Sequence, residues 1–206
     1  MVATALRLVD DVGVQAFTVR MLADALGSGT ATLYRHFTGR DEILVYVVDH
    51  VLGEITTPAP DGGASWQESL VAVADGLYGT LRRHPHIVPL LIAQVPVGPN
   101  GLAQRERVLR LLAERGFPAD LGARAFTAVT HYVIGFAAQQ HGPGSADPDG
   151  APALAAFYRG LDPAAFPSIT AASQALTDTP LEEEFHFGLG LLVRGLELLR
   201  DEPPQG

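Results

Sequence analysis

The sequence predicts an all-α fold with two helical parts, on three observations. Apolar residues recur at i, i+3, i+4 and i+7 along most of the chain, beginning with residues 2–12, as they do on the buried face of an α-helix. No stretch alternates polar and apolar residues with the period of two that marks a half-buried strand. Helix-capping and helix-ending residues stand at the ends of the periodic stretches. We therefore expect a three-helix N-terminal domain over residues 1–50 and a larger helical domain over residues 51–206.

The N-terminal part predicts short helices with clear ends. Gly13 is expected to end the first helix, because glycine readily takes the left-handed conformation that follows many helices. Thr18 is a suitable N-cap for a second helix, and Gly27 closes that helix. In a third short helix, Leu33 and Phe37 form the inward pair.

Two further helix starts carry a capping-box pattern. Thr38-x-x-Asp41 resembles such a box at the start of a fourth helix, and Ser65-x-x-Glu68 caps a long fifth one. Residues 57–64, between them, are rich in proline and glycine and predict a linker. Later helices are predicted over residues 102–115, 119–140 and 181–200. Residues 96–101 are predicted to form a loop and residues 142–150 a mobile loop. The stretch that follows, up to residue 176, is weakly patterned. Thr179 is the predicted N-cap of the last helix, with Pro180 at its first position.

Composition excludes several classes of protein. Apolar residues make up 47% of the chain and charged residues 18%, which rules out a disordered chain. The longest apolar stretch near the N-terminus, residues 43–48, is far shorter than the roughly 20 residues of a membrane span. Arg7, Asp10 and Asp11 interrupt the first turns, so no secretory signal is predicted and a cytoplasmic location is expected. The absence of cysteine excludes thiol catalysis, disulfides and cysteine-based zinc sites.

The net charge of −9 is unevenly distributed. Residues 1–50 hold four arginines and six acids, a net of −2, and residues 51–206 hold ten arginines and seventeen acids, a net of −7. Residues 25–40 contain Arg35 and Arg40 and no acid. Affinity for DNA depends on the contacting face, because charges beyond a Debye length of about 8–10 Å are largely screened. The acidic balance therefore predicts weak non-specific DNA affinity rather than none.

Residues 18–44 carry the most informative pattern. Two short helices separated by a tight Gly27-Ser28-Gly29 turn make a helix-turn-helix, whose second helix can enter the major groove of DNA. Small residues and one long donor share the outer face of that helix, with two larger polar residues at its flanks: Ser28, Ala31, Thr32 and Arg35, flanked by Tyr34 and His36. Such a face allows close approach to base edges, and its hydroxyls can donate to phosphate oxygens.

At the strings FTVRMLADALG and TLYRHFTGRDEIL the sequence resembles the tetracycline-repressor (TetR) family of bacterial regulators. The resemblance implies base contacts from Arg20, Thr30 and Ala31, with help from Arg35. It implies phosphate contacts from Thr18, Thr32, Tyr34, His36 and Arg40. Because few residues precede Leu6, no contribution from a basic N-terminal arm is expected.

The C-terminal half resembles the effector domain of tetracycline repressors, in the strings GFPADLGARAFTAVTHYVIGFAAQQ and FHFGLGLLVRGLELL. The resemblance implies a homodimer in which these two helices pair with their copies as a four-helix bundle. The last helix is apolar nearly all round, which requires burial on both sides, and Gly188 and Gly195 allow close helix approach. The expected interface residues are Phe126, Val133, Phe185, Leu189, Leu192, Leu196 and Leu199. The alternative is that this helix packs only within its own monomer.

An effector pocket is expected between the helices of the larger domain, with apolar walls and a few polar groups. The expected ligand-binding residues are Trp66, Leu70, Leu77, Tyr78, Leu81, Gln94, Leu112, Thr127, His131 and Phe136, with His84, Val108 and Val133 as further candidates. His84-Pro85-His86 is interpreted as a solvated helix end rather than a metal site. Tetracycline repressors hold their drug through magnesium and a histidine, and the corresponding residues 92–95 include no histidine, which argues against tetracycline–magnesium as the ligand. No metal and no cofactor are expected.

These patterns predict a ligand-responsive transcriptional regulator, most simply a repressor that a small apolar or drug-like effector releases from a palindromic operator. One alternative is a DNA-binding dimer without a small-molecule effector. The other is a small all-α enzyme, which the sequence disfavours because it contains no G-x-S-x-G elbow and no H-E-x-x-H motif.

Overall fold

A computed structural model describes residues 1–56, 64–140 and 150–201. These ranges contain helices and no strand, as the sequence predicts. The helices are α1 (Val2–Ala16), α2 (Val19–Ala25), α3 (Thr30–Tyr34), α4 (Arg40–Gly53), α5 (Trp66–Arg83), the 3-10 turn η1 (Pro85–Ile87), α6 (Val88–Ala93), α7 (Pro99–Glu114), α8 (Ala119–Gln140), α9 (Gly150–Arg159), α10 (Pro167–Ala172), α11 (Ala175–Asp178) and α12 (Leu181–Asp201). Within the described ranges, no helix is long and apolar enough to cross a membrane.

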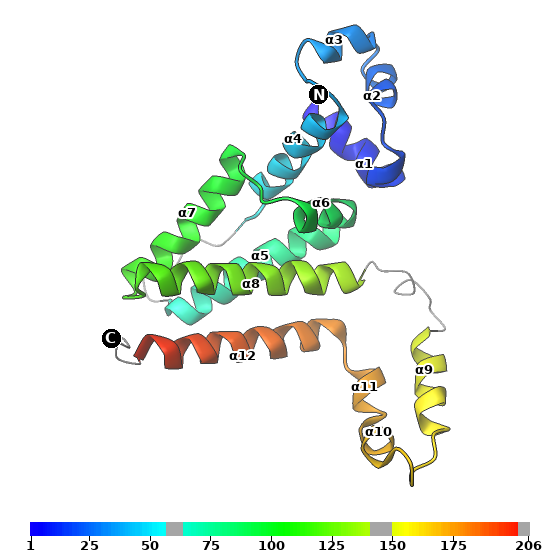
Figure 1. Cartoon of the computed structure of the whole chain (residues 1–206), viewed down its shortest axis with the longest axis vertical. Coiled ribbons are helices and arrows are strands. Elements are labelled where there is room, and N and C mark those ends of the chain that lie inside the picture. Colours follow the sequence, from blue (N-terminus) through cyan, green and yellow to red (C-terminus); the bar gives the residue numbers. More distant parts are fainter. Residues whose placement is uncertain (57–63, 141–149, 202–206) are drawn as a thin grey trace.

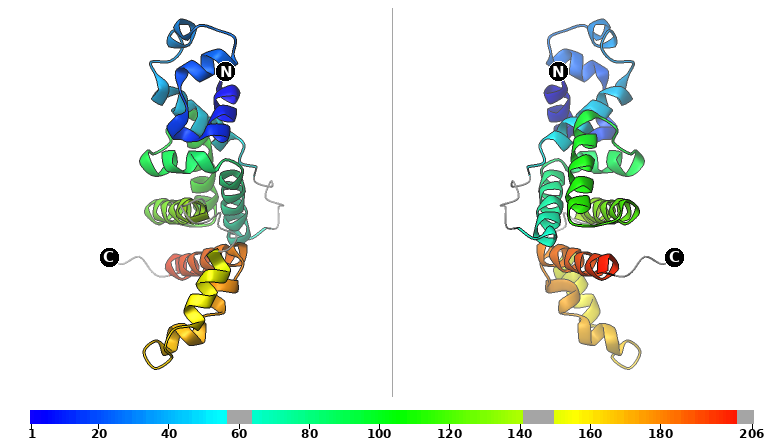
Figure 2. Two further views of the ribbon diagram at one scale, coloured as in Figure 1. Left: turned by 90° about the vertical axis from the view of Figure 1, so that its right-hand side faces the viewer. Right: turned by 90° about the vertical axis from the view of Figure 1, so that its left-hand side faces the viewer.

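The molecule is elongated, with α1, α2 and α3 at one end and an arm of α9, α10 and α11 at the other (Figure 1). Helix α4 runs from the first group into the larger part, where α5, α7, α8 and α12 pack together. Seen from the side, α8 and α12 lie as successive layers below the N-terminal helices (Figure 2). One hydrophobic core extends through both parts, from Val9 and Leu33 to Leu112 and Leu189.

Most predicted helix ends are confirmed, because they depend on local chemistry. Gly27 has φ of +62° after α2, and the Thr18 hydroxyl accepts the Met21 amide at 3.2 Å. Ser65 and Glu68 form the predicted capping box, in which each side chain binds the other's backbone amide. The predicted linker at 57–64 lies outside the described residues except for its last position, and so does the predicted loop at 142–150 except for its last.

Three predicted boundaries are wrong. Gly13, at φ of +79°, kinks α1, which continues for another turn to Ala16. Thr38 pairs with Glu42 rather than Asp41, because α4 begins one residue later than the predicted box requires. Helix α7 begins at Pro99, inside the predicted loop. The weakly patterned stretch before residue 176 contains the short helices α9, α10 and α11.

The predicted N-cap at Thr179 is also displaced. The Thr179 hydroxyl donates to the carbonyl of Ala175 at 2.7 Å, which ties it to the end of α11. The carbonyl of Pro180 instead accepts the first helical amides of α12, from Glu183 at 2.9 Å and Glu184 at 3.1 Å. The last helix therefore starts where predicted, although its threonine contacts the preceding helix.

Candidate DNA-binding surface and effector cavity

The outer surface of α2 and α3 presents the residues predicted to contact DNA. Most of these side chains are exposed: Thr18, Arg20, Thr30, Ala31, Tyr34, Arg35 and His36. Two are partly buried, Ser28 and Thr32, and Thr32 accepts a hydrogen bond from the Arg35 guanidinium at 3.3 Å. Helix α3 is held from beneath by Leu33, which is 1% exposed, and by Phe37, whose ring meets Tyr46 edge-on at 5.5 Å. The contacts of this surface with DNA stay a prediction.

Arg40 has a structural environment that the sequence did not indicate. Its guanidinium donates to the carbonyl of Phe17 at 2.9 Å and to the carbonyl of Val14. It also lies 3.3 Å from the Asp41 carboxylate. The first residue of α4 therefore ties down the corner between α1 and α2, and its donors are largely committed within the chain. This arrangement disfavours the phosphate contact expected of Arg40.

Glu42 stabilises the turn that leads from α3 into α4. Its carboxylate accepts hydrogen bonds from the backbone amide and the hydroxyl of Thr38, the latter at 2.7 Å. These two hydrogen bonds, the backbone one first, hold the pKa of Glu42 below its ordinary value. The charge also lies in the first turn of α4, where the helix dipole favours an anion.

Two polar clusters join the DNA-binding helices to the larger domain. In the first, Asp49 of α4 is buried and accepts the backbone amide of Gly101 at 2.9 Å and the Asn100 side chain at 3.1 Å. This carboxylate thereby caps the N-terminus of α7. A Cβ on Gly98 would lie 2.3 Å from the Asp49 carboxylate, so only glycine allows this approach.

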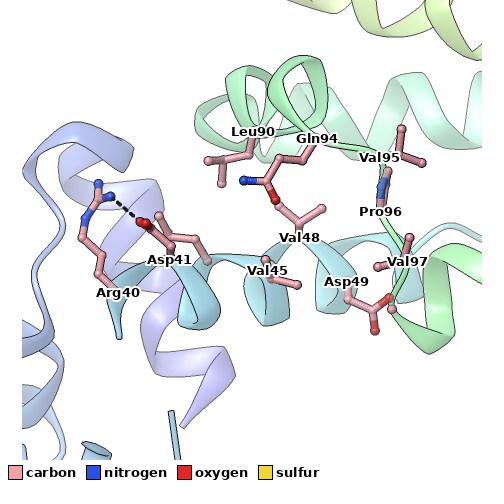
Figure 3. A pocket seen from close by; sticks show the side chains of 12 residues that line it. Arg40, Asp41, Val45, Val48, Asp49, Leu90, Gln94, Val95, Pro96 and Val97 are labelled. Carbon is pink, nitrogen blue, oxygen red and sulfur yellow. Dashed lines mark hydrogen bonds and ion pairs between the residues drawn. The ribbon is translucent and has the colours of Figure 1, made fainter. Parts of the chain in front are cut away.

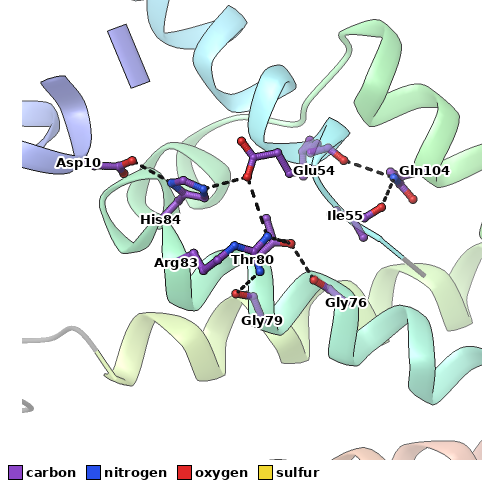
Figure 4. Close-up of polar contacts among 10 residues, drawn as sticks. Asp10, Glu54, Ile55, Gly76, Gly79, Thr80, Arg83, His84 and Gln104 are labelled. Carbon is purple, nitrogen blue, oxygen red and sulfur yellow. Dashed lines mark hydrogen bonds and ion pairs between the residues drawn. The ribbon is translucent and has the colours of Figure 1, made fainter. Parts of the chain in front are cut away.

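In the second cluster His84, at the end of α5, lies between two carboxylates (Figure 4). Its Nδ1 is 2.9 Å from Asp10 of α1, and its Nε2 is 3.0 Å from Glu54, which follows α4. Arg83 lies 3.9 Å from the same Glu54 carboxylate. The side chain of His84 is 14% exposed, so the interpretation of this histidine as part of a solvated helix end is wrong. No group of three or more metal-ligating residues suited to a metal ion occurs among the described residues.

The larger domain contains a partly open cavity of about 510 Å³. This volume lies within the range of about 300–1,000 Å³ typical of small-molecule sites. Its walls come from α4 to α8 and are mostly apolar. The lining residues are Leu52, Ile55, Leu70, Val73, Ala74, Leu77, Leu91, Val95, Pro96, Gly101, Gln104, Arg105, Val108, Leu109, Ala123, Phe126, Thr127, Val129, Thr130, His131, Val133 and Ile134.

Some of the predicted ligand-binding residues line this cavity and others do not. Leu70, Leu77, Thr127 and His131 line it, as do the further candidates Val108 and Val133. Trp66, Leu81 and Leu112 are buried in the core outside it, with Trp66 edge-on to Phe117 at 4.9 Å. The expectation that these three face an effector is not met, because helical spacing does not distinguish a core position from a cavity wall.

Tyr78 and Phe136 belong to an aromatic cluster where α5, α8 and α12 meet. Tyr78 stacks on Phe185 at 4.1 Å, and Phe136 lies 5.4 Å from the same ring. Tyr132 completes the cluster and donates its hydroxyl to the Phe185 carbonyl at 2.9 Å. Burial, together with the nearby Tyr78 and Glu184, raises the pKa of Tyr132, so this hydroxyl stays a neutral donor. The cluster packs the core instead of lining the cavity.

Gln94 faces a different, smaller groove, about 140 Å³ in volume, between α4 and the segment after α6 (Figure 3). There it lies beside Val45 and Val48 of α4 and close to Val95. The groove adjoins the cavity only through Val95 and Pro96, which line both. The expectation that Gln94 lines the effector cavity is therefore wrong.

The predicted interface residues fall into three environments. Phe185, Leu189 and Leu196 are buried within the chain, and Phe126 and Val133 line the cavity. Leu192 and Leu199 line an apolar groove of about 310 Å³ between α8 and α12. The most exposed apolar residues of α12 are Phe187 and Leu198, each 70% exposed, followed by Leu191 at 55%, Leu181 at 52% and Leu199 at 51%. Of the seven expected residues, Leu192, Leu199 and the largely buried Leu196 thus line this groove.

Sequence reasoning missed several residues that line the cavity. Leu52 lies in the last turn of α4 and Ile55 just after that helix, and Gln104, Arg105 and Leu109 come from α7. The helical period of α7 places residues 101, 104, 105, 108 and 109 on one side, which is a signal that could have found them. No local signal could place the end of α4 beside α7.

Comparisons with known proteins agree with this architecture. Residues 1–47 match the family model of bacterial regulatory proteins, tetR family, and residues 58–200 match that of the tetracyclin repressor-like C-terminal domain. An HTH-type transcriptional regulator of Saccharopolyspora erythraea is 36% identical over 134 residues, which span 65% of this chain and only 56% of that protein. The HTH-type transcriptional repressor DrrR1 of Streptomyces coeruleorubidus is 28% identical over 205 residues, 96% of this chain and 76% of that protein.

A solved structure is similar along nearly the whole chain. The TetR family protein ActR of Streptomyces coelicolor, in complex with actinorhodin, superposes with a TM-score of 0.88 at 32% identity. The superposition covers 98% of this chain and 96% of ActR.

Proposed function

This chain belongs to the TetR family of bacterial transcriptional regulators, and we propose that it is a repressor released from a palindromic operator by a small, largely apolar effector bound in the cavity. One observation carries the proposal. Helix α4 begins at Arg40, which holds the DNA-binding helices, and its far end contributes Leu52 and, just beyond it, Ile55 to the cavity wall. A molecule in the cavity therefore touches the same element that positions α3.

The link between cavity and α4 runs through Gln104 of α7. Its side-chain amide donates to the carbonyls of Leu52 and Ile55, at 3.3 and 3.4 Å, and the same residue lines the cavity. An effector that engages Gln104 or displaces it would alter the support of the last turn of α4. Such a ligand shifts the equilibrium between DNA-binding and released states only by its difference in affinity for the two.

The relatives support the proposal that the cavity binds an effector. ActR is described in complex with actinorhodin, so this fold can hold a small molecule. The apolar, partly closed cavity favours this function over a DNA-binding dimer without an effector. The relatives are transcriptional regulators, and we propose that this chain has no enzymatic activity and acts in the cytoplasm, where it meets its operator.

The homodimer is proposed to form on the outward faces of α8 and α12. The groove between these helices is lined by Leu191, Leu192, Gly195 and Leu199 beside Ala128, so small residues permit close approach of a second copy. Exposed rings on the arm, Phe157 and Phe166, extend the apolar surface available to that copy. A two-fold dimer would place two α3 helices about one DNA turn, or roughly 34–36 Å, apart.

We propose that residues 1–50 bind DNA and that residues 51–206 bind the effector and form the dimer. The test begins with selection of bound DNA from a random pool, which identifies the operator and its half-site spacing. Arg35→Ala and Tyr34→Ala are each expected to weaken binding to that DNA by about 1–3 kcal/mol, or roughly 5- to 150-fold, because each removes a base or phosphate contact.

Arg110→Ala is the matched control, because Arg110 is an exposed arginine on α7 of the larger domain and lines neither the cavity nor the groove between α8 and α12. Its removal should leave operator affinity nearly unchanged at moderate salt. Unchanged affinity of both α3 variants would contradict the assignment of α3 as the recognition helix. Recovery of single half-sites instead of palindromes would contradict the dimer.

A further inference from the structure

The charged residues of the cavity indicate the chemical class of its effector. The described residues that line the cavity include one arginine, Arg105, and no aspartate or glutamate. This is a sharp local contrast in a chain with 23 acidic and 14 basic residues. The cavity wall is therefore cationic or neutral wherever it is polar, although the protein as a whole is strongly acidic.

Arg105 is held in position against an aromatic wall. It lies on α7 and is half-buried, and its guanidinium carbon is 5.6 Å from the centre of the Phe126 ring on α8. No ion pair joins Arg105 to an acidic side chain in the part of the chain that the structure describes. Four other arginines, by contrast, each lie within 4.0 Å of a carboxylate. A half-buried guanidinium on a mostly apolar wall favours an anionic partner, because a charge-assisted hydrogen bond is strong where water is scarce.

The other polar side chains of the wall leave few donors for a ligand. The Thr127 hydroxyl donates to the Ala123 carbonyl at 2.9 Å, and the Gln104 amide donates to the end of α4. The remaining side-chain donors at hand are Arg105, His131 and the hydroxyl of Thr130. A ligand with an acidic group is therefore met chiefly by Arg105, while apolar rings fit the aliphatic and aromatic remainder of the wall.

We infer that the effector is an aromatic anion, whose ionised acidic group pairs with Arg105 and whose rings occupy the apolar wall beside Phe126. This inference rests on the proposed function, since it assumes that the cavity is the effector site. The planar guanidinium suits a carboxylate or sulfonate, to which it can donate two parallel hydrogen bonds. The same charge disfavours a cationic effector, and a neutral one would offer Arg105 no ionic partner beyond its contact with the Phe126 ring.

Two fluorescent probes with the same ring framework test the charge preference. 8-Anilinonaphthalene-1-sulfonate carries a sulfonate, and N-phenyl-1-naphthylamine lacks it. The wild-type protein is expected to bind the sulfonate probe more tightly in fluorescence titrations. Arg105→Gln should weaken binding of the sulfonate probe roughly tenfold or more and leave the neutral probe unchanged, because only the charge-assisted contact is lost.

Two control variants test whether the charge effect is specific to Arg105 and whether the probes bind in the cavity. Arg110→Gln removes a positive charge from an exposed position of the same helix, and it should change neither affinity. Val73→Trp places a large ring in the cavity from α5 and should abolish binding of both probes, with the melting temperature checking that the variant is folded. Probe binding that survives Val73→Trp in the folded protein lies elsewhere, on another apolar surface, and would contradict the inference.

The outcomes distinguish the claim that the effector is an anion from the claim that the cavity is the effector site. If the neutral probe binds in the cavity as tightly as the sulfonate, or if Arg105→Gln weakens both equally, the anionic effector is wrong while the cavity remains a ligand site. If neither probe binds, both the anionic effector and the cavity as an effector site are contradicted.

Discussion

The DNA-binding surface and the effector cavity differ in how their residues are brought together. The exposed side chains of α2 and α3 lie within one short segment, residues 18–36, and face outward from the buried Leu33 and the partly buried Phe37. The cavity wall draws on α4, α5, α6, α7 and α8, over residues 52–134. The first surface depends on helix periodicity and one turn, whereas the second depends on how five helices pack.

This difference predicts that a single substitution has different effects in the two regions. On the DNA-binding surface, neighbouring residues can have separate roles, because alternate sides of one short helix face the core and the solvent. In the cavity domain a residue meets partners far away in sequence, such as Gly188 with Tyr132 or Gln104 with Leu52. Substitutions there are expected to combine effects on packing with effects on binding.

The largest expected effect separates two neighbouring residues of α3. Leu33→Ala should lower the free energy of unfolding by about 2–5 kcal/mol, because it leaves a cavity beneath the recognition helix. Tyr34→Ala removes a side chain that is 58% exposed and should change that free energy by less than about 0.5 kcal/mol. Urea unfolding of both variants measures the difference. Equal stability of the two would mean that α3 is not anchored by Leu33.

A smaller effect is expected at the contact between α8 and α12. A Cβ on Gly188 would lie 2.3 Å from the Tyr132 hydroxyl oxygen. Gly188→Ala should therefore lower stability by about 1–3 kcal/mol, although alanine favours a helix by about 1 kcal/mol over glycine. Gly190→Ala is the matched control, because its Cβ meets no atom within 4 Å, and it should raise the melting temperature. A gain of stability at both positions would contradict the close approach.

The smallest effect concerns the short-range contact between Thr38 and Glu42. Because folding lowers the pKa of Glu42, its ionised form stabilises the folded protein above the ordinary pKa of glutamate, about 4.3. That contribution is lost as the pH falls through the lowered pKa of the folded state. Glu42→Gln should thus reduce the melting temperature slightly at pH 7, and the difference from wild type should shrink as the pH falls below the ordinary pKa of glutamate. A difference that is independent of pH would contradict the carboxylate's role.

The contrast also explains which predictions from sequence were accurate. Thr18, Gly27 and the Ser65–Glu68 box act on atoms within a few residues, so their side chains alone predict the helix ends. The sequence predicts that Gly13 ends α1, but one more turn follows the kink, and Arg40 from a later helix holds the Val14 and Phe17 carbonyls of this region. That contact spans 23 residues or more and has no local signature.

In the larger domain, helical periodicity identifies the apolar side of each helix. It does not show whether that side packs in the core, lines the cavity or forms an interface. Leu109 and Leu112 stand three residues apart on α7, yet the first lines the cavity and the second is fully buried in the core. Gln94 and Gln104 are both polar residues beside apolar stretches, and only Gln104 reaches the cavity. Phe185 was expected at a dimer interface, but it stacks on Tyr78 inside its own chain.

The sequence by itself determined the all-α class, most helix ends, the helix-turn-helix and the outward face of its second helix. These features depend on backbone hydrogen bonds, caps and a 3.6-residue period, all of which act over a few residues. Tertiary structure alone decided that Arg40 anchors α1, that Asp49 and His84 join the two parts, and that Arg105 stands on an acid-free cavity wall. The physical reason is that close packing brings together side chains whose separation along the chain carries no information about their contact.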